Sequence, residues 1–102
     1  MIAKADPKYL EKFDAAMLDI YERAKSETGY NATRFLQMIR QKGGYQTAVE
    51  LLSGRVTDVS DGFTHLALKQ RLDLSVEGLV LRDEWQPLFD AKLIKNARLR
   101  LK

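Results

Sequence analysis

A single histidine, His65, is the residue whose type best suits acid–base chemistry in this chain of 102 residues. Catalysis by a serine nucleophile would need it near a Gly-x-Ser-x-Gly turn, and the sequence contains no such turn. Cysteine is absent, which removes thiol catalysis and disulfides, and one histidine gives too few nitrogen ligands for a zinc site. Because His65 lies beside the apolar residues Phe63 and Leu66, we interpret it as a residue at the edge of a core.

Acidic residues are the next candidates for a catalytic pair or a calcium site. The four considered are Asp58, Asp61, Asp83 and Glu84. Their spacing does not match a calcium-binding loop. Asp61 and Asp83 stand where a helix or turn is expected to begin, and acids are common there because they interact favourably with the helix dipole. We therefore interpret all four as capping and surface residues.

Gly43-Gly44 is the one glycine pair that precedes an expected helix, as in a phosphate-binding loop. No strand is expected before it and no lysine follows in a P-loop pattern. We interpret the pair as the end of one helix and the start of another. Taken together, these residues predict a protein that is not an enzyme, with no metal, no cofactor and no small-molecule substrate identified.

Basic residues are concentrated at the end of the chain. Residues 1–90 have a net charge of −2, whereas residues 91–102 have a net charge of +5 and contain no acid. The five cations are Lys92, Lys95, Arg98, Arg100 and Lys102. They predict a basic amphipathic helix that could contact nucleic-acid phosphates, with Arg34, Arg40 and Lys42 as helpers. The simpler interpretation, which we favour, is that these cations solvate the outer face of a helix that closes the core.

The segment 31–53 could be a helix-turn-helix, since one helix is expected on each side of the glycine pair. Gln46 and Thr47 could then reach base edges from the start of the second helix. That helix carries Glu50 and no lysine or arginine, which is unfavourable for an approach to phosphates. We therefore do not favour sequence-specific DNA binding through this segment.

Apolar spacing and capping residues predict helices along the whole chain. The expected helices cover residues 7–28, 31–42, 46–53, 61–71, 75–81 and 91–102, with a connector at 55–60 and a turn at 83–89. The expected N-caps are Asp6, Asn31, Ser60 or Asp61, Ser75 and Asp90, and Gly29 is expected to end the first helix. We predict an all-α fold, a compact orthogonal bundle of six to seven mostly short helices that forms one domain over residues 1–102.

Three features are expected to be structural. The first helix carries an apolar stripe of Leu10, Phe13, Met17, Ile20 and Ala24, which we expect to pack within the domain, with a dimer seam as the alternative. Trp85 and Phe89 are expected to be largely buried. Asp73 is expected to fix a corner between two helices by capping N–H groups or pairing with Arg71, and a functional surface is the alternative.

The location of the protein is expected to be cytoplasmic. Residues 1–7 lack the apolar region of a signal peptide. No stretch approaches the roughly 20 apolar residues that a membrane-spanning helix needs, so we expect no membrane partner.

Two stretches carry a resemblance to a known family. The first is GYNATRFLQMI at 29–39, followed by Gly43-Gly44, and the second runs from SDGF at 60–63 to RLDLSVE at 71–77. They resemble a family of small uncharacterised bacterial helical proteins that occur alone or appended to nuclease-type domains, and the likeness covers roughly residues 18–101. The resemblance implies a compact helical domain and no established reaction, ligand or catalytic residue. Its nuclease-type neighbours imply an accessory role around DNA, such as restriction or defence against foreign DNA.

The favoured functional hypothesis is a non-enzymatic helical interaction module that binds a protein partner or a second copy of itself. The alternative is a nucleic-acid-binding accessory domain that uses the five cations of the basic C-terminal helix.

Overall fold

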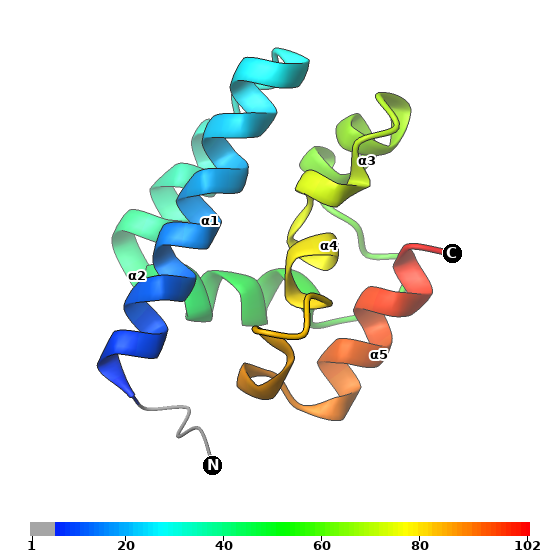
Figure 1. Cartoon of the computed structure of the whole chain (residues 1–102). Coiled ribbons are helices and arrows are strands. Elements are labelled where there is room, and N and C mark those ends of the chain that lie inside the picture. The colour runs from blue at the N-terminus through cyan, green and yellow to red at the C-terminus, as the bar shows by residue number, and fades with distance from the viewer. Residues whose placement is uncertain (1–5) are drawn as a thin grey trace.

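The structure is a computed structural model that describes residues 6–102, and these residues form five α-helices (Figure 1). The helices are α1 (Pro7–Thr28), α2 (Thr33–Leu52), α3 (Asp61–Leu68), α4 (Val76–Val80) and α5 (Ala91–Arg100). No strand occurs between residues 6 and 102, so the all-α class is confirmed. The expected number of six to seven helices is wrong. The expectation about the signal peptide rests in part on residues 1–5, which lie outside the described residues.

A kink in α2 accounts for part of this difference, because the helices expected at 31–42 and 46–53 are one element. Gly43, at the kink, has φ 83° and ψ 163°, a backbone conformation open almost only to glycine. The N–H of Gly44 donates to Asp14 Oδ1 at 2.6 Å and ties the kink to α1. The chain thus changes direction here without an intervening loop.

The helix-turn-helix that we considered, and did not favour, for residues 31–53 is not formed. The two halves of α2 are joined at one residue, with no turn segment between them. Thr47, which was expected to reach base edges, is fully buried and donates to the carbonyl oxygen of Gly43 at 2.8 Å. Its hydroxyl stabilises the kink and does not face a ligand.

Two segments form 3-10 turns where the sequence suggests a tight turn and a bend. These are Leu72–Leu74, between α3 and α4, and Gln86–Leu88, between α4 and α5. The first is followed directly by Ser75, which caps α4, and the second contains Pro87 near its start, where a proline is tolerated.

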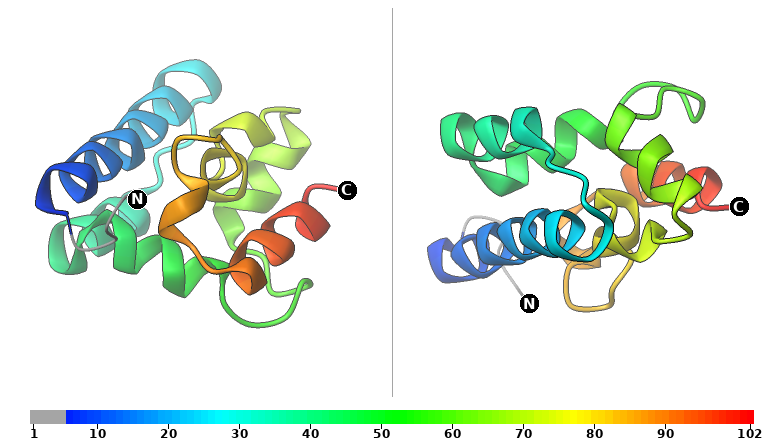
Figure 2. Two further views of the ribbon diagram at one scale, coloured as in Figure 1. Left: turned by 60° about the horizontal axis from the view of Figure 1, so that its bottom comes forward. Right: turned by 90° about the horizontal axis from the view of Figure 1, so that it is seen from above.

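The helices are arranged in two groups joined by the second half of α2. Figure 1 shows α1 beside the first half of α2, with α3, α4 and α5 on the other side of the molecule. The views in Figure 2 show the second half of α2 running from the α1 side toward the group that contains α5. The described residues measure 37 × 26 × 21 Å along their principal axes.

The core lies where these groups meet, and the apolar stripe of α1 forms one side of it. Phe13, Met17, Ile20 and Ala24 are all buried within the domain. Phe13, Met17 and Ile20 pack with residues of α2, α4 and α5, among them Leu52, Leu79 and Ala97, whereas Ala24 packs with Leu66 and Leu74. The expectation that the stripe packs within its own domain is confirmed for these four residues, and Leu10 is partly buried against the same core.

Trp85 and Phe89 are both buried, as expected, at 7% and 6% exposure. They flank the 3-10 turn Gln86–Leu88 and do not share the face of an α-helix. Phe13 contacts both rings edge-on, with ring centroids 5.3 Å from Trp85 and 5.5 Å from Phe89. These aromatic contacts hold the segment between α4 and α5 against α1.

The helix ends show which caps the sequence predicts correctly. Side chains of Asp6, Ser60, Ser75 and Asp90 each accept a hydrogen bond from a backbone N–H in the first turn of a helix. Gly29 ends α1 in the left-handed conformation, with φ 78°. Asn31 is the exception: Ala32 is the N-cap of α2, and Asn31 Oδ1 instead accepts a hydrogen bond from the Tyr21 hydroxyl at 2.8 Å.

The corner between α3 and α4 is held by Arg71. Its guanidinium donates to Asp73 Oδ1 at 3.1 Å and to Glu27 Oε1 on α1 at 2.7 Å. Asp73 caps no helix, because Ser75 caps α4. Of the two structural roles expected for Asp73, the structure shows the ion pair.

Asp73→Ala is expected to lower the free energy of unfolding by about 0.2–1 kcal/mol, the range for an exposed ion pair. The hydrogen bond from Arg71 lowers the pKa of Asp73, so the pair stabilises the fold above the unfolded pKa and this contribution is lost as pH falls through the lowered pKa. Urea melts of Asp73→Ala and of Asp83→Ala, an exposed acid without an ion-pair partner among the described residues, test this at pH 7 and pH 3. An equal loss of stability in Asp73→Ala at pH 7 and pH 3 would contradict the stabilising role of this ion pair.

Candidate functional site

His65 lies on α3 and stacks against the ring of Tyr30, with ring centroids 4.4 Å apart. Its Nε2 atom is buried and has no hydrogen-bond partner in the described part of the chain. No serine, threonine or carboxylate forms a hydrogen bond with it there. The ring thus packs a helix against the α1–α2 connection, in agreement with a residue at the edge of a core.

The four acidic candidates do not form one site. Asp58 accepts a hydrogen bond from the Arg55 backbone N–H at 3.0 Å, and this bond is the main reason that the pKa of Asp58 is lowered. Asp61 lies in the first turn of α3, directly after its cap. Asp83 and Glu84 are exposed. Residues 6–102 contain no group of three or more side chains of the types that hold a metal ion.

Arg100 is the cation that sequence reasoning placed wrongly. It was grouped with the cations that face solvent, but its side chain is fully buried. One guanidinium nitrogen lies 2.9 Å from Glu77 Oε2 on α4. The guanidinium also donates to four carbonyl oxygens at the end of α2 and in the loop after it: Leu51 at 2.7 Å, Ser53 at 3.2 Å, Arg55 at 2.9 Å and Val56 at 3.3 Å.

Glu77 shares this buried environment. Its burial raises the pKa of the carboxyl above the ordinary value, and the hydrogen bond from Arg100 only partly offsets this effect. Arg100 and Glu77 together connect α5 and α4 to the end of α2, so Arg100 is a structural residue and leaves the set that could contact phosphates.

The other four C-terminal cations are exposed. Lys92, Lys95, Arg98 and Lys102 form no ion pair within residues 6–102. The three proposed helpers are not part of this group. Lys42 pairs with Glu50 at 3.1 Å, and Arg34 and Arg40 lie in the first half of α2.

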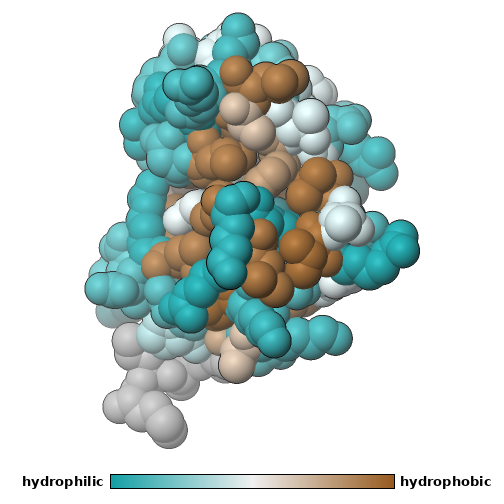
Figure 3. All heavy atoms as spheres, turned by 90° about the vertical axis from the view of Figure 1, so that its right-hand side faces the viewer, coloured by the Kyte–Doolittle hydropathy of each residue, from teal (hydrophilic) through white to brown (hydrophobic). Residues whose placement is uncertain are grey.

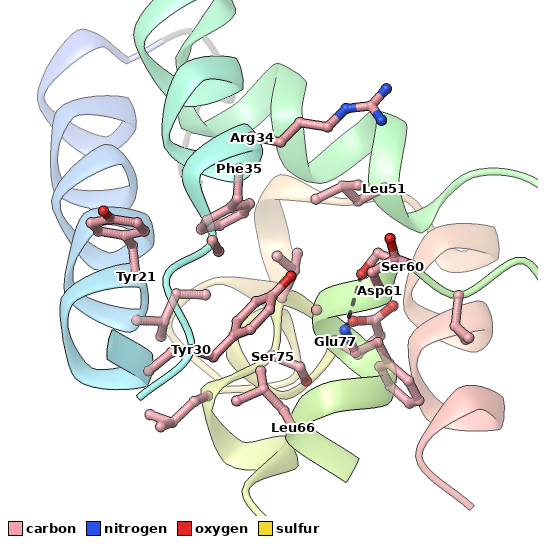
Figure 4. Close-up of a pocket in the computed structure, with 18 of the residues that line it drawn as sticks. Tyr21, Tyr30, Arg34, Phe35, Leu51, Ser60, Asp61, Leu66, Ser75 and Glu77 are labelled. Carbon is pink, nitrogen blue, oxygen red and sulfur yellow. Dashed lines mark hydrogen bonds between the residues drawn. The ribbon is translucent and has the colours of Figure 1, made fainter. Parts of the chain in front are cut away.

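A cleft of about 600 Å³ lies between two walls of the domain (Figure 4). One wall comes from the second half of α1, the α1–α2 connection and the start of α2. The other comes from the starts of α3 and α4 and the residues before them. Aromatic rings line both walls: Tyr21, Tyr30, Phe35 and Phe63. Aliphatic side chains fill the spaces between them: Ile20, Leu51, Val59, Leu66, Leu74 and Val76.

Tyr30 lies across the cleft, as Figure 4 shows, and Gly62 permits this position. A Cβ atom at residue 62 would lie 3.4 Å from the Tyr30 ring, closer than most Cβ contacts, so the glycine leaves room for the aromatic ring against α3. Because His65 lies one turn further along α3, the Tyr30 ring packs against both residues. This contact holds Tyr30, in the first of the two stretches described above, against Gly62 and His65 in the second.

The hydroxyl groups of the two serines in the cleft already form hydrogen bonds within the fold. Ser60 Oγ accepts the N–H of Phe63 at 3.1 Å. Ser75 Oγ accepts the N–H of Gly78 at 3.0 Å and donates to the carbonyl oxygen of Leu72 at 2.6 Å. Neither serine contacts a base that would activate it. The cleft can therefore bury apolar groups of a ligand and offers a few polar groups at its edge.

Sequence reasoning missed the cleft, although it named several of its residues for other roles. The lining comes from five separate parts of the chain, near residues 20–24, 30–35, 51, 59–66 and 74–77. A signal did exist, because Tyr30 and Phe63 are aromatic residues that directly follow a glycine. Their proximity depends on the packing of α3 against the α1–α2 connection, which the spacing of apolar residues within single helices does not encode.

Comparisons with known proteins found no match, whether against protein-family models, curated proteins or solved structures. The resemblance to small bacterial helical proteins is thus neither supported nor contradicted by them. None of the helices within residues 6–102 combines the length and apolar character needed to cross a membrane.

Proposed function

We propose that this domain is a non-enzymatic protein-interaction module whose cleft receives an apolar peptide segment of a partner protein. The observation that carries this proposal is the cleft between the start of α2 and the starts of α3 and α4, which is lined on both sides by aromatic rings. Its volume of about 600 Å³ falls within the range of about 300–1,000 Å³ typical of binding sites. Four aromatic rings in one depression provide the kind of surface into which an anchor residue of a partner packs.

Exposed residues along the cleft favour a peptide segment as its occupant. Val59 lines the cleft and is 36% exposed, so an apolar side chain is accessible at the edge of the cleft. Arg34 on one wall and Asp61 on the other have no ion-pair partner within the described residues. Opposite charges on the two walls would orient a segment that carries an acidic and a basic residue on either side of its apolar anchor.

A matched pair of substitutions tests the cleft. Val59→Asp places a charge in the apolar lining, whereas Leu18→Asp makes the same change at a residue of α1 that is 39% exposed and lies outside the cleft. Peptides of 12 residues are selected from a displayed random library against the unmodified domain, and their affinities are measured by calorimetry. We expect Val59→Asp to weaken binding at least about tenfold, or 1.4 kcal/mol, and Leu18→Asp to leave it within about twofold.

Chemical-shift changes of backbone amides show where the selected peptides bind. We expect the changes to concentrate at residues 30–35 and 59–66. Equal effects of the two substitutions, or shift changes that lie away from the cleft, would contradict the proposal. Self-association of the domain that Val59→Asp abolishes would replace the peptide by a second copy of the chain as the occupant.

A further inference from the structure

The exposed side of α5 carries Lys92, Lys95 and Arg98 in a single row, and Lys102 lies just beyond the C-terminal end of the helix. We call these four cations the cationic stripe. The three members within the helix are three residues apart, a spacing that places side chains one above another. The apolar residues Ile94 and Ala97 lie on the opposite, buried side. Because the side chain of Arg100 is buried in the core, four of the five C-terminal cations remain exposed.

The charges of the stripe are not neutralised within residues 6–102. All 14 acidic residues of the chain precede residue 91, so α5 itself contributes none. Asp90, at the start of the helix, is occupied as its cap and accepts the N–H of Leu93 at 3.0 Å. Four cations that precede α5, namely Arg23, Lys42, Arg55 and Arg71, each have an acidic partner within 4 Å.

The buried side of α5 fixes the position of the stripe. Asn96 donates to the carbonyl oxygens of Leu52 at 3.1 Å and Gly54 at 3.2 Å, and Arg100 binds the same end of α2 and its following loop. Along the chain, Asn96 lies between Lys95 and Arg98, and Arg100 lies between Arg98 and Lys102. The stripe is thus presented on a helix that the core holds in place, which reduces the ordering cost of binding.

We propose that the cationic stripe binds the phosphate backbone of duplex nucleic acid without reading its sequence. Residues 92 to 102 extend about 15 Å along the helix axis, and a duplex presents about nine phosphates over that length. Flexible lysine and arginine side chains on one face can follow such a row of charges. Lysine and arginine bind phosphates whatever the base sequence, so this binding needs no base contacts.

An anionic membrane is the less suitable polyanion for this surface. A helix that lies in a membrane interface needs large apolar side chains on its exposed face. The large apolar residues exposed between residues 6 and 102 are Leu18, Val59 and Leu68, and none belongs to α5. Figure 3, which views the side that includes α5, shows hydrophilic side chains projecting over the apolar surface.

The stripe and the cleft share no residue, because no residue of α5 lines the cleft. Nucleic-acid binding is therefore a second function, independent of peptide binding. Either proposal can be wrong without affecting the other. A protein that binds both a peptide segment and nucleic acid would bring a partner protein to nucleic acid.

The salt dependence of binding tests this proposal. Fluorescence anisotropy with a labelled 20-base-pair DNA duplex measures the affinity from 50 to 200 mM salt. Four neutralised phosphates give a log–log slope of about −3.6, which is a loss of affinity of about 150-fold over this range. The double substitution Lys95→Gln and Arg98→Gln leaves two contacts, so we expect a slope of about −1.8 and a loss of about 12-fold.

A control variant carries the same change in net charge at another surface. Lys12→Gln with Lys25→Gln removes two exposed cations of α1, and we expect it to retain the slope of the unmodified protein. Circular dichroism melts confirm that both variants are folded. The proposal is wrong if the unmodified domain does not bind the duplex at 50 mM salt, or if the two variants change the slope equally. Binding to phosphatidylserine vesicles without binding to DNA would also overturn it.

Discussion

Replacing Trp85 with alanine is expected to lower the free energy of unfolding by about 3–5 kcal/mol, the range for removal of a large aromatic side chain from a core. Trp85 is 7% exposed and its ring contacts Phe13 edge-on and Tyr9 in a stacked arrangement. Alanine would leave a cavity among these rings. Because Phe13 and Tyr9 belong to α1, the substitution would also loosen the segment between α4 and α5 from that helix.

The aromatic contacts extend beyond Trp85, which is why its loss should not be absorbed locally. Phe13 also contacts Phe89, and Phe89 stacks on Tyr45 of α2 with ring centroids 5.5 Å apart. Well-packed interiors relax only in part around a missing ring. The expected loss is therefore near that of a central core residue, although Trp85 lies outside the five helices.

Trp85→Phe is the matched control for this prediction. The indole Nε1 is buried without a hydrogen-bond partner among the described residues, so phenylalanine removes an unsatisfied donor and keeps most of the ring contacts. We expect its loss to be under about 1.5 kcal/mol. Urea melts followed by circular dichroism measure both variants, since each lacks the only tryptophan of the chain. Similar losses for the two variants would contradict the role given to the ring contacts.

Most helix ends could be predicted because each depends on residues that are close in sequence. Asp6, Ser75 and Asp90 cap helices as expected, and Gly29 ends α1. These interactions span two or three residues, so the sequence contains all the information they need. The same holds for the apolar stripe of α1, whose spacing follows the period of one helix.

The position of the kink in α2 could be predicted, but not how its two halves are joined. Two adjacent glycines commonly end a helix, and Gly43 has non-helical φ and ψ where the sequence suggests that one helix ends and another begins. The second half starts directly after Gly43, and its Gly44 N–H donates to Asp14 of α1. This contact joins residues 30 positions apart, so the spacing within one segment does not encode it. Asn31 illustrates the same point, because Tyr21 of α1 binds the side chain that would otherwise cap α2.

The candidate sites were predictable only in part. The basic helix at the end of the chain is visible in the sequence, but sequence alone does not show which of its cations are buried. Arg100 occurs at the position where the helical period returns to the side of Ile94 and Ala97, and this period was a signal that it faces the core. An arginine is normally assigned to the surface, and its burial here is favourable because Glu77 and the carbonyl groups at the end of α2 accept its hydrogen bonds.

Replacing Arg100 with methionine is expected to lower the free energy of unfolding by about 3–5 kcal/mol, the range for loss of one partner of a buried ion pair. Methionine fills most of the volume but donates no hydrogen bond. Glu77 would then be buried without a cation, and the carbonyl oxygens of Leu51 and Ser53 would lose a donor. Arg98→Met is the matched control, since it makes the same substitution two residues away at an exposed position, and we expect it to change stability by less than about 0.5 kcal/mol.

The pH dependence of Arg100→Met separates loss of the ion pair from simple loss of packing. Burial raises the pKa of Glu77, and without Arg100 that pKa should rise further. A carboxyl whose pKa is raised in the folded state stabilises the fold below its unfolded pKa, and this contribution is lost as pH rises through the folded pKa. Relative to the unmodified protein, Arg100→Met should thus lose more stability at pH 8 than at pH 5.

Adding Glu77→Gln should abolish that difference, because glutamine cannot ionise. Urea melts of the single and double variants at both pH values measure the difference. A loss that is independent of pH in Arg100→Met would show that Arg100 acts through packing and the carbonyl groups alone.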